Sequence, residues 1–146
     1  MSDAFSKMVA ILLAVVMMYI VPVFYMREEA DRLRQTYILE TIVSFTDGVR
    51  NTGILGKKDY DVLMDELGGL NEIYTVEITH CISRVDNTTN VSEYYVDRYY
   101  NEQILSVFEA GEDYYLKKAD YLKVVVKDRN KDIIAWYGGS VRYEAY

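Results

Sequence analysis

The chain has 146 residues and a formal net charge of −7, a length that accommodates one domain. Because Asp3 and Lys7 cancel, the whole acidic excess belongs to the part after Met26. A domain this acidic lacks the basic surface that binds nucleic acid, so we expect no nucleic-acid partner. A single cysteine, Cys81, excludes an internal disulfide and a cysteine-based metal cluster.

An uncharged stretch near the amino terminus, Met8 to Met26, predicts a membrane helix that follows a short tail at 1–7. Its length is about what an α-helix needs to cross roughly 30 Å of hydrocarbon. The alternative is a cleaved signal peptide, which has a shorter apolar core and small residues at its cleavage site. The long core and its bulky end favour a retained anchor. Membrane helices tolerate an internal proline such as Pro22 because neighbouring groups bond the freed carbonyl.

The stretch 27–52 predicts an amphipathic continuation of the same helix. Its apolar positions recur at three- and four-residue steps and form one stripe: Leu33, Tyr37, Ile38, Thr41, Ile42, Phe45 and Val49. No turn signal separates the two parts, so one helix from Met8 to Thr52 would be about 65 Å long. The run Asn51-Thr52-Gly53 predicts its end, since glycine adopts the left-handed conformation that follows a last helical turn.

Residues 53–146 predict a head domain of short helices and strands. The patterns favour helices over Lys58 to Leu67 and Asn101 to Ala110, a loop over Asp86 to Asn90, and strands over Glu72 to Val85, Tyr121 to Lys127, Ile133 to Tyr137 and Val141 to Tyr146. Helices first and strands later indicate an α+β fold. We expect the long helix to pack on one face of a small antiparallel sheet.

No set of residues points to catalysis, so we expect no enzyme activity, no cofactor and no metal. His80 and Cys81 are adjacent, but neighbouring residues of a strand point to opposite faces, so one site would not easily use both. No second histidine or cysteine is present to complete a tetrahedral zinc site. The spacing of the many carboxylates singles out no glycosidase pair. We therefore interpret His80 as a structural residue of a strand.

The plan of anchor, amphipathic helix and β-rich head resembles that of type IV pilins and pseudopilins. A sharper resemblance, to the small single-pass TadE-like pseudopilins of Tad pili and related secretion systems in Gram-positive bacteria, lies in Thr36-Tyr37, Phe45, Val49-Arg50-Asn51-Thr52-Gly53, Tyr60, Leu63 and Ile73-Tyr74-Thr75-Val76-Glu77-Ile78-Thr79-His80. The family implies a pilin-like fold, an extracytoplasmic head, assembly through the membrane helix and a role in starting or capping a filament.

The chain departs from the family at the prepilin cleavage site. Ala4-Phe5 stands where the junction is expected, but Val9 occupies the position at which the mature family members carry a glutamate. This departure argues against processing by a prepilin peptidase and against a conventional place in a filament core.

The candidate assembly and packing residues lie along the predicted helix. Helices in lipid associate by close packing, and Ala10 and Ala14 offer a small-residue face for it. Pro22 is a further candidate within the membrane stretch. Leu33 and Tyr37 are candidates for partner contact close to the membrane. For Ile42, Phe45 and Val49, near the head, we expect packing against the protein's own sheet instead.

These patterns predict a membrane-anchored structural subunit, a minor pseudopilin-like component of a Tad or type IV pilus-like assembly or a secretion apparatus. Its partners would be the membrane, other pilin-like subunits and secretion platform proteins; any small-molecule ligand is unknown. The alternative is a single-pass, membrane-tethered binding or sensory module with no filament role. We expect the protein to reside in the cell membrane as a single-pass protein, with the head outside the cytoplasm. The positive-inside rule leaves the orientation open, because Lys7 lies before the span, and Arg27, Arg32 and Arg34 follow it among acidic residues.

Overall fold

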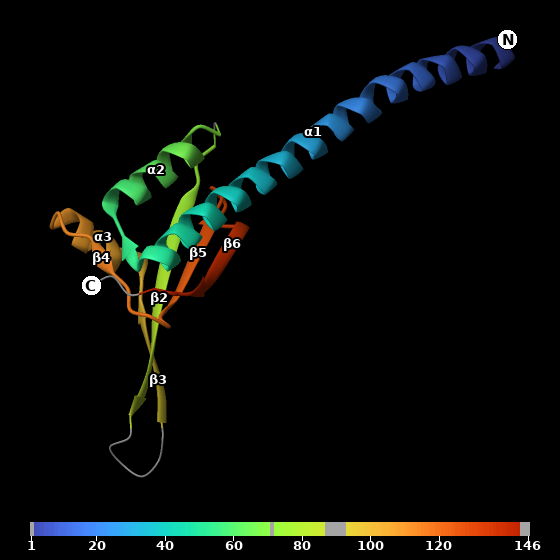
Figure 1. Cartoon of the computed structure of the whole chain (residues 1–146). Helices are drawn as coiled ribbons and strands as arrows, with labels where there is room; N and C mark the ends of the chain where they lie inside the picture. The colour runs from blue at the N-terminus through green and yellow to red at the C-terminus, as the bar shows by residue number, and fades with distance from the viewer. Residues whose placement is uncertain (1, 71, 87–92, 144–146) are drawn as a thin grey trace. The chain divides into compact units, whose positions relative to one another are not determined.

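The computed structural model describes residues 2–70, 72–86 and 93–143 (Figure 1). The chain divides into two compact units, Met1–Thr36 and Tyr37–Tyr146. The elements in chain order are α1 Ser2–Thr52, β1 Ile54–Leu55, α2 Lys57–Gly68, β2 Thr75–Asp86, β3 Glu93–Tyr99, α3 Asn101–Glu109, β4 Tyr114–Tyr115, β5 Tyr121–Lys127 and β6 Ile133–Ser140.

Helix α1 runs through both units and ends where the sequence predicts. It begins at Ser2, before the predicted start at Met8, and its last residue is Thr52. Gly53 follows with φ of 70°, and its N–H donates a hydrogen bond of 2.8 Å to the carbonyl oxygen of Val49. This left-handed glycine with a bond back into the last turn is the predicted stop.

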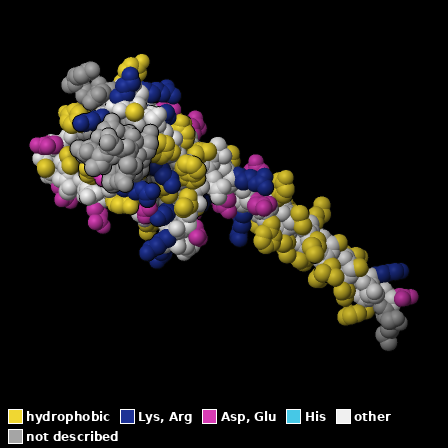
Figure 2. All heavy atoms as spheres, turned by 90° about the horizontal axis from the view of Figure 1, so that it is seen from below, with side chains coloured by type: hydrophobic (Ala, Val, Ile, Leu, Met, Phe, Trp, Pro, Cys, Tyr) yellow, Lys and Arg dark blue, Asp and Glu magenta, His cyan; other side chains and the backbone are white. Residues whose placement is uncertain are grey.

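The first unit consists of α1 alone, and its side chains from Asp3 to Leu33 are all exposed. Figure 2 shows hydrophobic side chains covering the visible face of this stretch between its charged ends. The helix is long and apolar enough for a membrane span or a signal sequence. So much uncovered apolar surface is far more than a soluble monomer ordinarily exposes.

The second unit is built on an antiparallel sheet. Within the described residues, β3, β2, β5 and β6 form a four-stranded sheet in that order, and β1 pairs with β4 in a separate small ladder. Along β2, Val76, Ile78 and His80 are buried while Thr75 is exposed and Glu77 and Thr79 are partly exposed. This alternation is the predicted one, since successive residues of a strand point to opposite faces.

The carboxyl-terminal part of α1 packs on this sheet and supplies one side of the core. The buried apolar residues include Ile38, Ile42 and Val49 from α1, Leu63 and Leu67 from α2, Val76 and Ile78 from β2, Ile104 and Phe108 from α3, and Leu122, Val124 and Val126 from β5. The fold is thus the predicted α+β arrangement, a long amino-terminal helix on an antiparallel sheet with a pilin-like architecture.

The prediction for the carboxyl-terminal strands was wrong in part. The glycine pair Gly138-Gly139 was interpreted as a break before a further strand from Val141 to Tyr146, but β6 continues through it to Ser140. Val141 to Tyr143 form no strand, and 144–146 lie outside the described residues. The glycines do not break the strand but allow neighbouring segments to approach it closely. A Cβ at Gly138 would stand 2.8 Å from the carbonyl oxygen of Leu122.

Two further differences concern β2 and β3. The sequence predicts a strand from Glu72 to Val85. The observed strand β2 covers Thr75–Asp86, so it begins three residues later and ends one residue later than predicted. The remainder of the predicted loop, 87–90, lies outside the described residues. β3 was not predicted at all.

Candidate functional site

The described part of the chain holds no candidate metal centre. Within 2–70, 72–86 and 93–143, no group of three or more histidine, cysteine or acidic residues is placed to hold a metal ion. His80 is 2% exposed, and Cys81 next to it is partly exposed on the strand's other side. Three arrangements of side chains remain to be considered: a groove, an arginine network and a buried histidine network.

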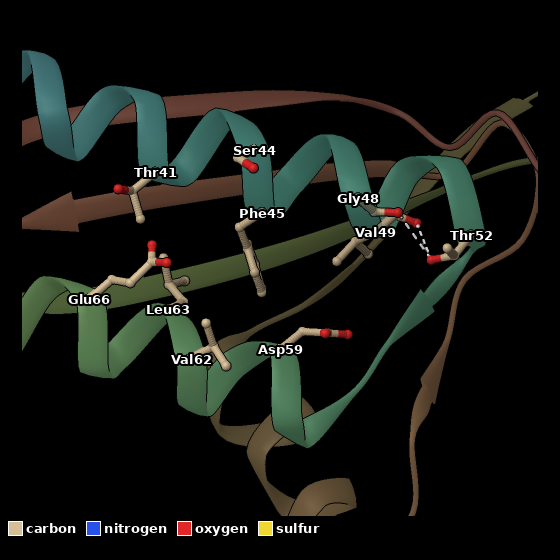
Figure 3. Close-up of a pocket in the computed structure, with 10 residues that line it drawn as sticks. All are labelled: Thr41, Ser44, Phe45, Gly48, Val49, Thr52, Asp59, Val62, Leu63 and Glu66. Atoms are coloured by element: carbon tan, nitrogen blue, oxygen red, sulfur yellow. Dashed lines mark hydrogen bonds between the residues drawn. The ribbon is translucent and has the colours of Figure 1, made fainter.

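The groove lies between the carboxyl-terminal part of α1 and helix α2 (Figure 3). It has a volume of about 300 Å³ and is lined by Thr41, Ser44, Phe45, Gly48, Val49, Thr52, Asp59, Val62, Leu63 and Glu66. Its apolar floor is formed by Phe45, Val49 and Leu63, and polar side chains of both helices border it. The space over Gly48 is open, because a Cβ at this position would meet nothing within 4 Å.

The α2 side of the groove carries negative charge. Asp59 and Glu66 are exposed and seven residues apart, which places them about 10 Å apart along the helix axis. Asp59 lies toward the Thr52 end of the groove and Glu66 toward the Thr41 end (Figure 3). Within the described ranges neither carboxylate forms an ion pair. Between them Val62 leaves 56% of its surface exposed, so the groove suits an apolar surface that carries positive charge.

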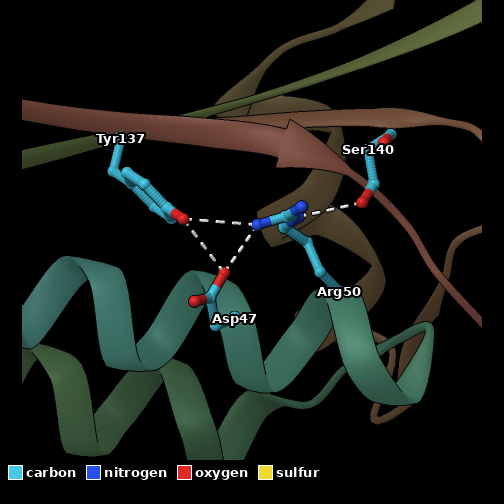
Figure 4. A network of polar contacts seen from close by, with 4 residues as sticks. All are labelled: Asp47, Arg50, Tyr137 and Ser140. Carbon is cyan, nitrogen blue, oxygen red and sulfur yellow. Dashed lines mark hydrogen bonds and ion pairs between the residues drawn. The ribbon is translucent and has the colours of Figure 1, made fainter.

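The arginine network fixes the end of α1 to strand β6 (Figure 4). Arg50 Nη1 lies 2.6 Å from Asp47 Oδ1, and Arg50 Nε donates to the carbonyl oxygen of Ser140 at 2.9 Å. The hydroxyl of Tyr137 donates to Asp47 Oδ1 at 3.3 Å and lies 3.4 Å from Arg50 Nη1. Because the Arg50 side chain is only 11% exposed, its charge depends on these partners.

A glycine makes room for this arginine. A Cβ at Gly139 would stand 2.5 Å from the guanidinium carbon of Arg50, so any larger residue would displace the side chain. The backbone carbonyl of Arg50 also accepts the N–H of Arg142 at 2.9 Å. The network therefore ties three segments of the second unit together, and we interpret it as structural.

The histidine network is buried under the sheet's helical side. His80 Nδ1 lies 2.8 Å from the Tyr114 hydroxyl, and Nε2 lies 2.9 Å from Asp120 Oδ2. A neutral ring protonated at Nε2 satisfies both contacts, accepting from Tyr114 and donating to Asp120. The same Asp120 oxygen accepts the N–H of Lys117 at 2.8 Å. The ring stacks on Tyr99 with centroids 5.6 Å apart.

This network is closed to substrates, since His80 is 2% and Asp120 6% exposed. Burial, followed by the nearby Tyr99 and Asp120, raises the pKa of Tyr114 to about 12. A phenol that holds its proton so firmly acts as a hydrogen-bond donor. The strand position of His80 was predicted, but its partners were not, because they lie 34 and 40 residues away in the sequence.

The predicted assembly residues fall in two settings. Ala10, Ala14 and Pro22 lie on the exposed apolar stretch of α1, and Leu33 and Tyr37 are 65% and 44% exposed. Their side chains thus stay available for partners. The residues expected to pack against the protein's own sheet do so in part: Ile42 and Val49 are buried in the core, whereas Phe45 is partly buried and also lines the groove.

Comparison with known proteins yields no match among protein-family models, curated proteins or solved structures. The groove was not predicted, since nothing in the sequence shows that two helices leave a space between them. Its only sequence signal is a run of small residues at four-residue steps, Ser44, Gly48 and Thr52.

Proposed function

We propose that the protein is a membrane-anchored structural subunit, a minor pseudopilin-like component of a Tad or type IV pilus-like assembly or a secretion apparatus. One observation carries the proposal. A single helix, α1, begins as a stretch exposed on all sides and apolar enough for a membrane span, and ends packed on an antiparallel sheet. A subunit that assembles through its anchor and presents a folded head needs both properties in one element.

The physical basis of assembly lies in the membrane stretch. Lipid tails are as apolar as leucine, so helices in a bilayer associate through close packing rather than through the hydrophobic effect. Ala10 and Ala14 are one turn apart on α1 and allow a partner helix to approach closely. The head, with its net acidic charge, stays in solvent away from anionic lipid head groups.

The second candidate is a membrane-tethered binding or sensory module. The observation that favours it is the groove between α1 and α2, with its apolar floor and unpaired carboxylates at the rim within the described residues. In this function the head would recognise a ligand or envelope partner, and the anchor would only hold it at the membrane.

Photo-cross-linking in intact cells separates the two functions. A small diazirine residue replaces Ala10, and a matched control places it at Leu12, which lies on the opposite side of the helix by its spacing of about 200°. Tagged protein is purified after irradiation and its partners are identified by mass spectrometry. We expect stronger cross-linking at position 10, to other pilin-like subunits, to further copies or to a secretion platform. Equal yields at both positions, or only unrelated receptors, would contradict an assembly role.

A further inference from the structure

We propose that the groove between α1 and α2 binds the Met26–Tyr37 stretch of α1 from a second copy of this chain. The inference rests on the proposed function, since it names one contact of an assembly subunit. It concerns a surface of the head rather than a contact between membrane stretches.

The stretch Met26–Tyr37 presents one face suited to such a contact. At about 100° per residue, a face about 120° wide contains apolar side chains along one side, two arginines along the other and no carboxylate. Its members are Met26, Arg27, Ala30, Leu33, Arg34 and Tyr37. The acidic residues Glu28, Glu29 and Asp31 all lie about 100° or more from the centre of this face. Leu33 and Met26 are 65% and 71% exposed.

The charges on the two surfaces have opposite signs and the same spacing. Arg27 and Arg34 are seven residues apart on α1, as are Asp59 and Glu66 on α2, so each pair spans about 10 Å. A docked helix can therefore place both arginines against both carboxylates at once. Arg34 Nη1 already lies 3.8 Å from Asp31 Oδ1, with side chains that are 33% and 69% exposed, and an ion pair this open to solvent contributes little and can be exchanged.

The groove also has the steric properties that a helix requires. Ser44, Gly48 and Thr52 follow one another at four-residue steps on α1 and let a neighbouring backbone come close. The exposed Val62 and the floor residue Phe45 supply apolar contact for a side chain such as Leu33. Because the groove lies lengthwise between two helices (Figure 3), its form matches a row of side chains.

The contact requires the two copies to be displaced along the helix axis. Leu33 and Gly48 are fifteen residues apart in α1, so docking a parallel helix with Leu33 beside Gly48 shifts one copy by about 22 Å. The test therefore uses the full chain released from the membrane, so that two copies can shift freely along α1.

The test is disulfide formation between two differently tagged full-length chains in detergent, both carrying Cys81→Ala. One copy carries Leu33→Cys and the other Val62→Cys. The matched control replaces Val62→Cys with Trp136→Cys, which is also at a position 56% exposed but lies on the sheet face opposite α1 by strand alternation. We expect the Leu33–Val62 disulfide to exceed the control at least tenfold. Equal yields would overturn the inference.

Two further variants identify the groove and the charges as the cause. Gly48→Phe fills the groove and should abolish the disulfide, whereas Gly68→Phe should not. Both glycines are helical, and at both a Cβ meets nothing within 4 Å. Asp59→Lys combined with Glu66→Lys should also abolish the disulfide, and Arg27→Glu with Arg34→Glu in the other copy should restore it. A disulfide that survives Gly48→Phe shows that the contact lies elsewhere and refutes the inference.

The outcomes separate this inference from the proposed function. If the Leu33–Val62 disulfide fails while position 10 cross-links to pilin-like partners in cells, only the groove contact is wrong. If position 10 finds no such partner and the disulfide also fails, the assembly role falls with it. Capture of a small ligand or an unrelated helix by the groove, without the disulfide, assigns the groove to another occupant.

Discussion

The two parts of helix α1 differ in what surrounds them, although they are one continuous helix. From Asp3 to Leu33 every side chain is exposed, whereas Ile38, Ile42 and Thr46 are fully buried in the second unit. The sequence explains the difference, because 8–26 is apolar all round and 27–33 is largely charged, whereas the part packed on the sheet is apolar along a stripe. An all-round apolar helix suits lipid, and a striped helix suits a sheet.

The same comparison explains where specific polar contacts occur. The buried part of α1 is held by Arg50 and Asp47, which bond to strand β6, while the exposed part has local contacts such as Arg34 with Asp31. One hydroxyl in the buried part, that of Thr46, has no hydrogen-bond partner within the described residues. The structure offers no physical account of this hydroxyl.

The largest expected effect on stability comes from shortening a buried side chain in the part of α1 that packs on the sheet. Ile42→Ala removes buried methyl groups from the core and should lower the free energy of unfolding of the head by about 2–5 kcal/mol. Ile11→Ala, in the apolar part, should leave it unchanged within about 0.5 kcal/mol. Urea unfolding of the full chain in detergent, followed by circular dichroism, measures both. Equal losses would show that the two parts do not differ as described.

A smaller loss is expected when the polar attachment of α1 is removed. Arg50→Ala deletes charged hydrogen bonds to Asp47 and Ser140 and should cost about 1.5–3 kcal/mol in the same unfolding measurement. Arg50→Lys should recover only part of this, since a lysine cannot reproduce the geometry of a guanidinium. The exposed Arg32→Ala serves as the control and should change stability by less than about 0.5 kcal/mol. A loss at Arg32 as large as at Arg50 would contradict the structural role.

The buried Tyr114 predicts that the free energy of unfolding of the head depends on pH in the alkaline range. The folded-state pKa of Tyr114 is raised from 10.0 to about 12, so the folded head holds this proton more tightly than the unfolded chain. Its contribution to stability is complete below pH 10 and is lost as the pH rises through about 12. The free energy of unfolding should therefore fall more steeply in this window for the natural chain than for Tyr114→Phe. Parallel pH profiles would show that Tyr114 titrates normally.

The smallest effect on stability is expected at the border of the two parts. Leu33→Asp places a charge on a side chain that is 65% exposed, so the unfolding free energy of the head should change by less than about 0.5 kcal/mol. Cross-linking between copies of the full chain in detergent should fall markedly, because the substitution puts a carboxylate on the proposed contact face. A substantial loss of folding would instead assign Leu33 to the protein's own core.

The fold followed from local sequence signals where these were strong. The end of α1 at Thr52 was set by Gly53, and the buried face of β2 was set by alternation through Val76, Ile78 and His80. The course of β6 through Gly138 and Gly139 was not predictable, because the reason for these glycines lies in the approach of Leu122 and Arg50 from elsewhere in the chain.

The candidate site was less predictable than the fold for the same reason. The apolar stretch with Ala10 and Ala14 is visible in the sequence because its signal is local. The groove depends on how α1 and α2 pack, and the partners of His80 depend on strand pairing across many residues. Contacts of this kind arise from tertiary structure, and no pattern within a short window encodes them.

The central claim is that the first part of α1 belongs in a membrane while the second part belongs to the folded head. Alkaline carbonate extraction of membranes from cells that express the full chain tests it most directly. We predict that the protein stays in the membrane pellet, as an integral anchor does, and that Val15→Lys combined with Val16→Lys shifts it to the supernatant. Release of the natural chain into the supernatant would show that the apolar stretch is not a retained anchor and would contradict the account.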